Sequence, residues 1–264
     1  MSDSTAPMHG PRWSARAGDW AELSSPSSRP AWEAVATATE IGAGTRVLDV
    51  GCGSGEFCRL AADRGATVSG IDAAEGMIEI ARRRTPDADL RVGGMELLPW
   101  DDDSFDVTTG FNSFQFAADV VAALVDAKRV TRPGGCVAIC HWGRPEDNEL
   151  FAVIGAVREL QPPPPPGSPP PGPPTLGEPG ALEEVAERAR LRPLRSEEID
   201  LLFEAPDRQK LERAMLAPGA VLPAIEYSGE ERVRAAVAEA AAPFRQADGS
   251  YRFANRYRFL VTEA

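Results

Sequence analysis

The sequence predicts an α/β fold built on a seven-stranded, mostly parallel sheet. The first observation is an apolar run at residues 47–50, which leads into a turn with glycine at every second position and then into a helix-like segment. The second is the alternation of strand-like and helix-like segments over residues 45–142, because short connections between them favour parallel crossovers. The third is the alternating apolar and polar pattern at residues 251–261, which predicts a closing strand.

The elements are expected in the following order along the chain. The alternating region predicts strands at 46–50, 67–71, 89–92, 106–110 and 136–141, and helices at 55–64, 75–84 and 119–130. A helix is then expected at 148–160, and ten prolines among residues 162–174 predict an extended connector. Beyond the connector the pattern predicts a helix at 179–193, a strand at 194–203, helices at 206–217 and 229–242, and the last strand.

Two segments lie outside this alternating framework. Residues 1–40 form a polar arm whose tryptophans, Trp13, Trp20 and Trp32, either anchor it on the core or make it a lid. Residues 205–245 are longer than an ordinary connection and predict a helical cap inserted in the main domain, 41–264. The proline run is either a stiff connector or a docking site for a partner, and we prefer the connector.

The glycine turn indicates which kind of cofactor binds. It reads Asp49-x-Gly51-x-Gly53-x-Gly55, whereas a dinucleotide site reads G-x-G-x-x-G and keeps acids away from the pyrophosphate. The acids here suit a cofactor with a cationic amine and no phosphate, which disfavours an NAD-dependent dehydrogenase. Asp72 ends the next strand, where a carboxylate can accept hydrogen bonds from both hydroxyls of a ribose.

Four ordered segments resemble those of the class I S-adenosylmethionine (SAM)-dependent methyltransferases, in particular bacterial small-molecule enzymes of the ubiquinone and menaquinone type. They read DVGCGSG at 49–55, GIDAAEGMIEIAR at 70–82, GGMELLPWDDDSFDV at 93–107 and RVTRPGG at 129–135. The resemblance implies a Rossmann-like seven-stranded sheet with an antiparallel last strand, and SAM as the cofactor.

The resemblance also implies which residues bind the cofactor. The methionine end would lie against Asp49, Gly51, Cys52 and Gly53, and the ribose against Asp72, with Ala73 and Met77 following it. The adenine would lie near Gly94, Met95 and Glu96, and the methionine moiety would rest on Phe111 and Asn112. The family often has an acid where this chain has Gly94, so the adenine would depend on the backbone or side chain of Met95.

The acceptor side is expected at the carboxyl ends of the fourth and fifth strands. His141 follows the fifth strand and is the candidate general base, because its ordinary pKa suits proton transfer near pH 7. The alternative is a histidine that caps the strand or shapes the pocket. His9, near the N-terminus, is not expected to contribute.

Five further residues are predicted to contact the acceptor. They are Trp20 of the arm, Gln115 and Phe116 after the fourth strand, and Trp142 and Arg144 after the fifth. Gln115 would orient polar groups, and Phe116 would line an apolar pocket or belong to the core. Arg144 would hold a carboxylate or, alternatively, form an ion pair with Glu146 or Asp147.

Composition excludes some function classes. A net charge of −12 disfavours nucleic acid as a partner, and no apolar run reaches membrane-spanning length or resembles a signal-peptide core, so a cytoplasmic protein is expected. Two histidines and four cysteines without a CxxC disfavour a metal site. Monomer and dimer both remain open.

The predicted function is transfer of a methyl group from SAM to an oxygen, nitrogen or carbon atom of a small-molecule acceptor, in keeping with bacterial secondary metabolism. One alternative is a SAM-binding enzyme of the same fold that catalyses a different reaction. Another is a non-catalytic interaction protein that docks through the proline run. The acceptor's identity is not encoded in any motif.

Overall fold

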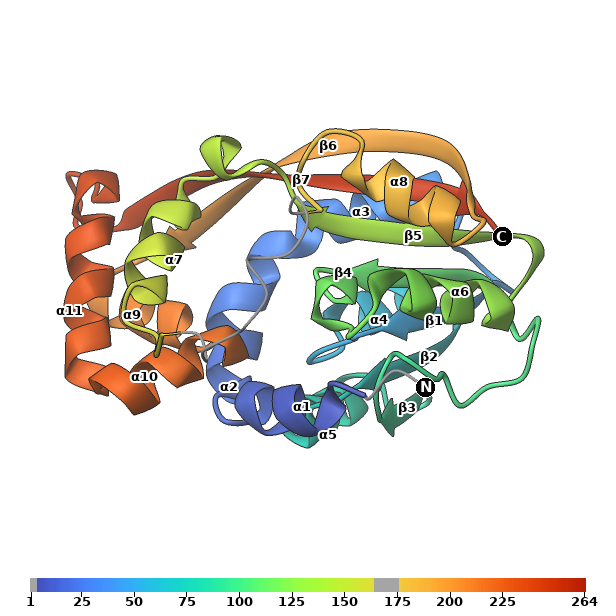
Figure 1. Ribbon diagram of the computed structural model, residues 1–264, viewed down its shortest axis with the longest axis horizontal. Coiled ribbons are helices and arrows are strands. Elements are labelled where there is room, and N and C mark those ends of the chain that lie inside the picture. Colours follow the sequence, from blue (N-terminus) through green and yellow to red (C-terminus); the bar gives the residue numbers. More distant parts are fainter. Residues whose placement is uncertain (1–3, 164–175) are drawn as a thin grey trace.

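The computed structural model describes residues 4–163 and 176–264 (Figure 1). The predicted connector at 162–174 therefore lies outside the described residues from position 164 onward.

The described residues contain a seven-stranded sheet with the order β3-β2-β1-β4-β5-β7-β6. The first five strands pair in parallel, and β7 runs antiparallel to both of its neighbours, as predicted. The strands are β1 (Arg46–Val50), β2 (Thr67–Asp72), β3 (Asp89–Val92), β4 (Phe105–Phe111), β5 (Thr131–Trp142), β6 (Arg192–Ala205) and β7 (Tyr251–Glu263). The order reverses between β1 and β4, which places the carboxyl ends of these two strands beside the crevice where such sheets bind ligands.

Helices cover both faces of the sheet. One face packs against α3 (Arg29–Ala38), α4 (Glu56–Asp63) and α5 (Glu75–Arg84). The other packs against α6 (Val120–Val130) and α8 (Ala181–Arg188). α6 begins where the Asp119 carboxylate accepts hydrogen bonds from two backbone N–H groups of its first turn, which satisfies donors that the helix leaves unpaired.

A second core lies at the far end of β6 and β7. Residues 251–256 of β7 pair only with β6, because β5 ends opposite Tyr257, so the two strands extend past the sheet as a ribbon. Helices pack around this ribbon on the left of Figure 1: α7 (Leu150–Arg158), α9 (Arg208–Leu216), α10 (Leu222–Ser228) and α11 (Glu230–Ala241). The cap thus includes α7, which lies before the proline run and outside the predicted 205–245 insertion.

The N-terminal arm contributes α1 (Ala6–Ser14), α2 (Ala17–Asp19) and a π-helical turn at Trp20–Ser24. α1 and α2 pack on α5, and the turn packs on α9, so this part of the arm connects the nucleotide-binding half to the cap. α3 instead lies against the sheet, with Ala31, Val35 and Ala36 fully buried. The part of the arm that borders the site is therefore residues 5–28 together with Trp32.

Several predicted boundaries were wrong. The strand expected at 136–141 begins at Thr131, with a shift in register before Cys136. The helix expected at 179–193 ends at Arg188, because Arg190 adopts a left-handed conformation with φ of 59°. The strand expected at 194–203 begins at Arg192 and includes Pro193, which β6 accommodates as the edge strand with a shift in register at that point. The short helix α10 was not predicted.

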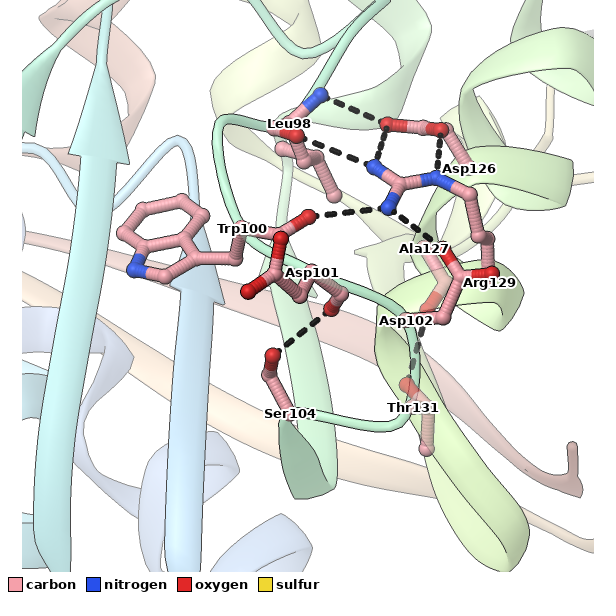
Figure 2. A network of polar contacts seen from close by, with 9 residues as sticks. All are labelled: Leu98, Trp100, Asp101, Asp102, Ser104, Asp126, Ala127, Arg129 and Thr131. Carbon is pink, nitrogen blue, oxygen red and sulfur yellow. Dashed lines mark hydrogen bonds and ion pairs between the residues drawn. The ribbon is translucent and has the colours of Figure 1, made fainter.

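A polar network fixes the loop that leaves β3 (Figure 2). The Arg129 guanidinium donates to the Leu98 carbonyl at 2.9 Å and to the Trp100 carbonyl at 2.8 Å, and it pairs with Asp102 and Asp126. Asp126 also accepts the Leu98 N–H at 2.6 Å. The planar guanidinium thus ties the loop to α6 and helps to position the preceding residues, Gly94 and Met95, at the site.

Within the described residues, no helix combines the length and apolar character needed to cross a bilayer.

Candidate functional site

The glycine turn after β1 is built for close backbone approach. Gly51, Gly53 and Gly55 all have positive φ (73°, 52° and 82°), a conformation that other residues adopt only with strain. A Cβ on Gly51 would lie 2.3 Å from Cβ of Ser113, and one on Gly55 would lie 2.7 Å from Cβ of Ala81. The Gly51 and Cys52 N–H groups both donate to the Ile71 carbonyl, which ties the turn to β2.

Asp72 stands at the tip of β2, facing this turn. Each carboxylate oxygen accepts one backbone hydrogen bond, from Gly53 at 2.9 Å and from Ala74 at 2.8 Å. Each oxygen therefore keeps a lone pair that can accept a ligand hydroxyl. Burial raises the pKa of Asp72, and the two backbone hydrogen bonds oppose this shift. The side chain is held in one orientation before any ligand binds.

Asp49 is the more deeply buried acid of the pair. It accepts a hydrogen bond from the Thr109 hydroxyl at 2.8 Å, and it is 2% exposed. Burial raises the pKa of Asp49 to about 7, and the nearby carboxylates of Asp72 and Glu56 add to the rise. Such a group favours a cationic ligand, because a positive charge nearby would restore its ionised form.

The tip of β4 continues the site toward β5. Asn112 has φ of 49°, a left-handed conformation that asparagine tolerates, and its N–H donates to the Cys140 carbonyl at 2.8 Å. Its side-chain oxygen accepts the Trp142 N–H at 3.0 Å. Asn112 therefore joins the ends of β4 and β5.

These elements open into one cavity of about 360 Å³, within the range of small-molecule sites. It is bordered on one side by the strand tips and on the other by the arm and the cap. Most of the predicted site residues line it: Asp49, Gly51, Cys52, Gly53, Asp72, Ala73, Met77, Gly94, Met95, Phe111, Asn112, Trp20, Gln115, Phe116 and Trp142.

His141 does not line the cavity. Side chains alternate across a strand, so Cys140 and Trp142 share one face of β5 while His141 faces the other way, with Val137 and Ile139. Its Nδ1 lies 2.8 Å from the Trp142 carbonyl oxygen, and burial lowers its pKa. This placement speaks against His141 as the general base and matches the alternative of a histidine that shapes the strand end.

Two other predicted residues also lie outside the cavity lining. Arg144 forms ion pairs with Glu146 and Asp147 at 3.2 and 3.1 Å, which is the predicted alternative to carboxylate binding. Glu96 accepts hydrogen bonds from the arm: from the Thr5 N–H at 3.1 Å, the Thr5 hydroxyl at 2.9 Å and the Ser4 hydroxyl at 3.0 Å.

The arm also explains the glycine at position 94. A Cβ there would lie 2.5 Å from Oγ of Ser4 and 2.6 Å from a carboxylate oxygen of Glu96. An acid at this position would collide with the arm and add a second negative charge beside Glu96. Glycine stands here in place of the family's acid because the arm occupies the space that a larger side chain would need.

Sequence reasoning missed several lining residues. His9 and Trp13 line the cavity, and both rings make edge contacts with Phe116, with centroids 5.0 and 5.7 Å apart. Burial and the Arg12 guanidinium lower the pKa of His9, while Glu96 opposes them. The available signal was helical spacing, because His9, Trp13 and Trp20 recur at intervals of four and seven.

Comparison with known proteins finds relatives for the region that contains the glycine turn. Residues 48–139 match a family model described as a methyltransferase domain. Malonyl-[acyl-carrier protein] O-methyltransferase of Serratia marcescens is 38% identical over 94 residues, which are 36% of this chain and 37% of that protein. Demethylmenaquinone methyltransferase of Renibacterium salmoninarum is 36% identical over 102 residues, 39% of this chain and 43% of that protein. The matches thus span less than half the length of these relatives.

A solved structure extends the likeness to most of the chain. The YcgJ protein of Bacillus subtilis aligns with a TM-score of 0.56 at 18% identity, over 88% of this chain and 97% of that one. At this identity the likeness shows the fold alone.

Proposed function

The chain belongs to the class I SAM-dependent methyltransferases, and on this premise we propose that it transfers a methyl group from SAM to an oxygen, nitrogen or carbon atom of a small-molecule acceptor. One observation carries the proposal. Asp49 and Asp72 flank a turn of positive-φ glycines and open into the same cavity as an apolar wall from the cap.

The residues present fit SAM. The positive-φ turn leaves room for the methionine end, Asp49 suits its ammonium group, and the free lone pairs of Asp72 suit the ribose hydroxyls. Met77 and Met95 would supply polarisable contacts for the adenine ring. Bound SAM would supply an activated methyl group on a sulfonium whose leaving group is neutral.

The protein's own contribution is orientation and exclusion of water. Trp13 and Trp20, with ring centroids 5.0 Å apart, cover the turn from the arm, and the Trp20 indole nitrogen lies 3.9 Å from the Cβ position of Gly53. A covered site holds the acceptor in line with the methyl group and keeps competing water away. Tyr257 lines the cavity where His141 does not, and burial raises its pKa, so it would orient an acceptor rather than remove its proton.

Calorimetry with S-adenosylhomocysteine, the demethylated cofactor, tests the proposal. Asp72→Asn should weaken binding by about 1.5–3 kcal/mol, because a charge-assisted acceptor for the ribose is lost. Asp87→Asn, an exposed acid in the loop before β3, is the control and should change nothing. Equal affinities in the two variants would remove Asp72 from the cofactor site, and tighter binding of NADH would contradict the function.

Turnover separates methylation from the alternative reaction. Mass spectrometry of the cofactor after incubation with an acceptor mixture should show S-adenosylhomocysteine accumulating together with a methylated product. Product formation with intact SAM would instead support a reaction in which the cofactor is only a scaffold.

A further inference from the structure

The cavity extends beyond the cofactor turn into the cap. α7 contributes Leu150, Val153, Ile154 and Val157 to its lining, at the i, i+3, i+4 and i+7 spacing of one helix face. At 1.5 Å per residue this apolar face is roughly 10 Å long. A further part of the lining is also apolar and comes from α9 and the segment that follows it, with Met215, Pro218 and Val221.

One end of this chamber, the part of the cavity beside α7, lies at the tip of the sheet. The Leu150 N–H donates to the buried side chain of Asn255 on β7, two residues from Tyr257. The ring of Tyr257 packs against Trp142 with centroids 4.6 Å apart, and its hydroxyl lies 3.4 Å from that of Ser28. In such a pair one hydroxyl donates to the other, which leaves the second proton for a ligand.

The other end lies where α7 ends. The Gln161 side chain donates to the Ala220 carbonyl at 2.9 Å, and the Ser228 hydroxyl donates to the Leu160 carbonyl at 2.8 Å, so the helix end is tied to α10. Arg158 lines the cavity here, in the last turn of α7. Over residues 4–163 and 176–264, no carboxylate lies within ion-pair distance of its guanidinium, although the protein is strongly acidic.

We infer that the chamber binds an acceptor with an extended apolar body and an anionic group, such as a carboxylate, at the end away from the methylated atom. The apolar face of α7 would hold the body, Arg158 would hold the anion, and the Tyr257–Ser28 pair would hold the reacting end beside Asn112. The inference rests on the proposed function, because it assigns the acceptor half of the same cavity.

The first experiment varies the length of a simple probe. Calorimetry on the full chain saturated with S-adenosylhomocysteine compares butanoate, hexanoate and octanoate. Affinity should rise about fourfold per added methylene until the chamber is filled, since each methylene is transferred from water to an apolar wall. Equal affinities along the series would overturn the apolar part of the inference.

The second experiment tests the anionic end with matched arginines. Arg158→Gln should weaken octanoate binding up to about fivefold, the size expected for an exposed ion pair, and should leave 1-octanol binding unchanged. Arg188→Gln is the control, because Arg188 is also exposed in the last turn of a helix, α8, but does not line the cavity. The same loss in both variants, or none in Arg158→Gln, would overturn the role of Arg158.

A third variant separates this inference from the proposed function. Ile154→Glu places an acid on the half-buried face of α7, so it should abolish octanoate binding while the affinity for S-adenosylhomocysteine stays as in the parent. If octanoate fails to bind the parent protein while S-adenosylhomocysteine binds, the inference fails and the proposed function stands. If S-adenosylhomocysteine does not bind, the proposed function fails. Methylation of octanoate itself would reverse the assigned orientation.

Discussion

The two halves of the cavity are made in different ways. The proposed cofactor half is built from strand tips and one backbone turn, in which Gly51 and Gly53 leave room, Asp72 accepts two backbone hydrogen bonds and Asp49 accepts one from Thr109 on the neighbouring strand. The acceptor half is built from side chains on the arm, α7, α9 and β7, segments far apart in the sequence. The first half follows from the parallel strands that end at one edge of the sheet, and the second depends on how distant helices pack.

The difference is also electrostatic. Asp49, Asp72 and Glu56 all line the cofactor half, so this part of the cavity is acidic and suits a ligand that carries positive charge. The acceptor half is apolar along α7 and ends at a cation, Arg158. The charges of the two halves therefore favour a cationic cofactor in one and an anionic, apolar acceptor in the other.

The largest effect is expected from a substitution that strains the backbone turn of the cofactor half. Gly51→Ala adds left-handed strain at φ of 73° and a Cβ 2.3 Å from Ser113, so we expect a loss of about 2–5 kcal/mol in the free energy of unfolding and of S-adenosylhomocysteine binding. Gly44→Ala is the matched control. It has the same kind of φ, 84°, but no atom within 4 Å of the new Cβ, so it should show only the strain, about 1–2 kcal/mol. Urea unfolding compares the two, and equal losses would contradict a packing role for Gly51.

The cofactor half was predictable because its signals are contiguous. The glycine turn, the acid at the end of β2 and the segment at 93–107 each occupy a few consecutive residues, and the structure brings nearly all of them to the cavity. The alternation of elements likewise predicted the parallel pairing of the first five strands. Glu96 is the exception, because nothing in its neighbourhood showed that Ser4 and Thr5 would reach it from the arm.

In the acceptor half, the prediction for His141 used its position along the chain and ignored the face of the strand on which its side chain lies. His141 lies next to the site along the chain but on the wrong face of β5, and parity alone would have shown this, since Cys136, Cys140 and Trp142 share the other face. Tyr257 and the apolar face of α7 could not be assigned, because a period-2 strand and an amphipathic helix indicate burial without naming the partner. The sequence predicted a cap but did not show that α7 belongs to it.

A smaller effect, the pH dependence of ligand binding, tests the difference in charge between the two halves. The pKa of Asp49 is raised to about 7 by burial, so the carboxylate that would pair with the ligand ammonium is only partly ionised in neutral solution. The affinity for S-adenosylhomocysteine should therefore rise about fivefold between pH 6 and pH 7 and level off before the ligand amine itself deprotonates near pH 8. Calorimetry over this range gives the profile.

Asp49→Asn is the variant that checks this assignment. It should weaken binding at pH 7 and flatten the acid side of the profile. The unliganded protein should respond in the opposite sense: because the folded pKa is raised, Asp49 lowers the free energy of unfolding as pH rises from the ordinary carboxyl range through 7, and asparagine removes that loss. An unchanged profile in the variant would assign the titration to another group.

The smallest effect tests how the arm joins the two halves. Glu96→Ala removes the acceptor for Thr5 and Ser4, so hydrogen exchange should speed up over α1 and the affinity for S-adenosylhomocysteine should fall about fivefold, while the sheet stays protected. Glu79→Ala, an exposed acid on α5, is the control.

Partial burial raises the pKa of Glu96, but the hydrogen bonds from Thr5 and Ser4 outweigh this, and the pKa lies below its ordinary value. The arm should therefore stay closed above the ordinary carboxyl range and loosen as pH falls through the lowered pKa. Loosening in alkaline solution instead, or equal exchange in the two variants, would show that the arm is held by the contacts of Trp13 and Trp20 alone.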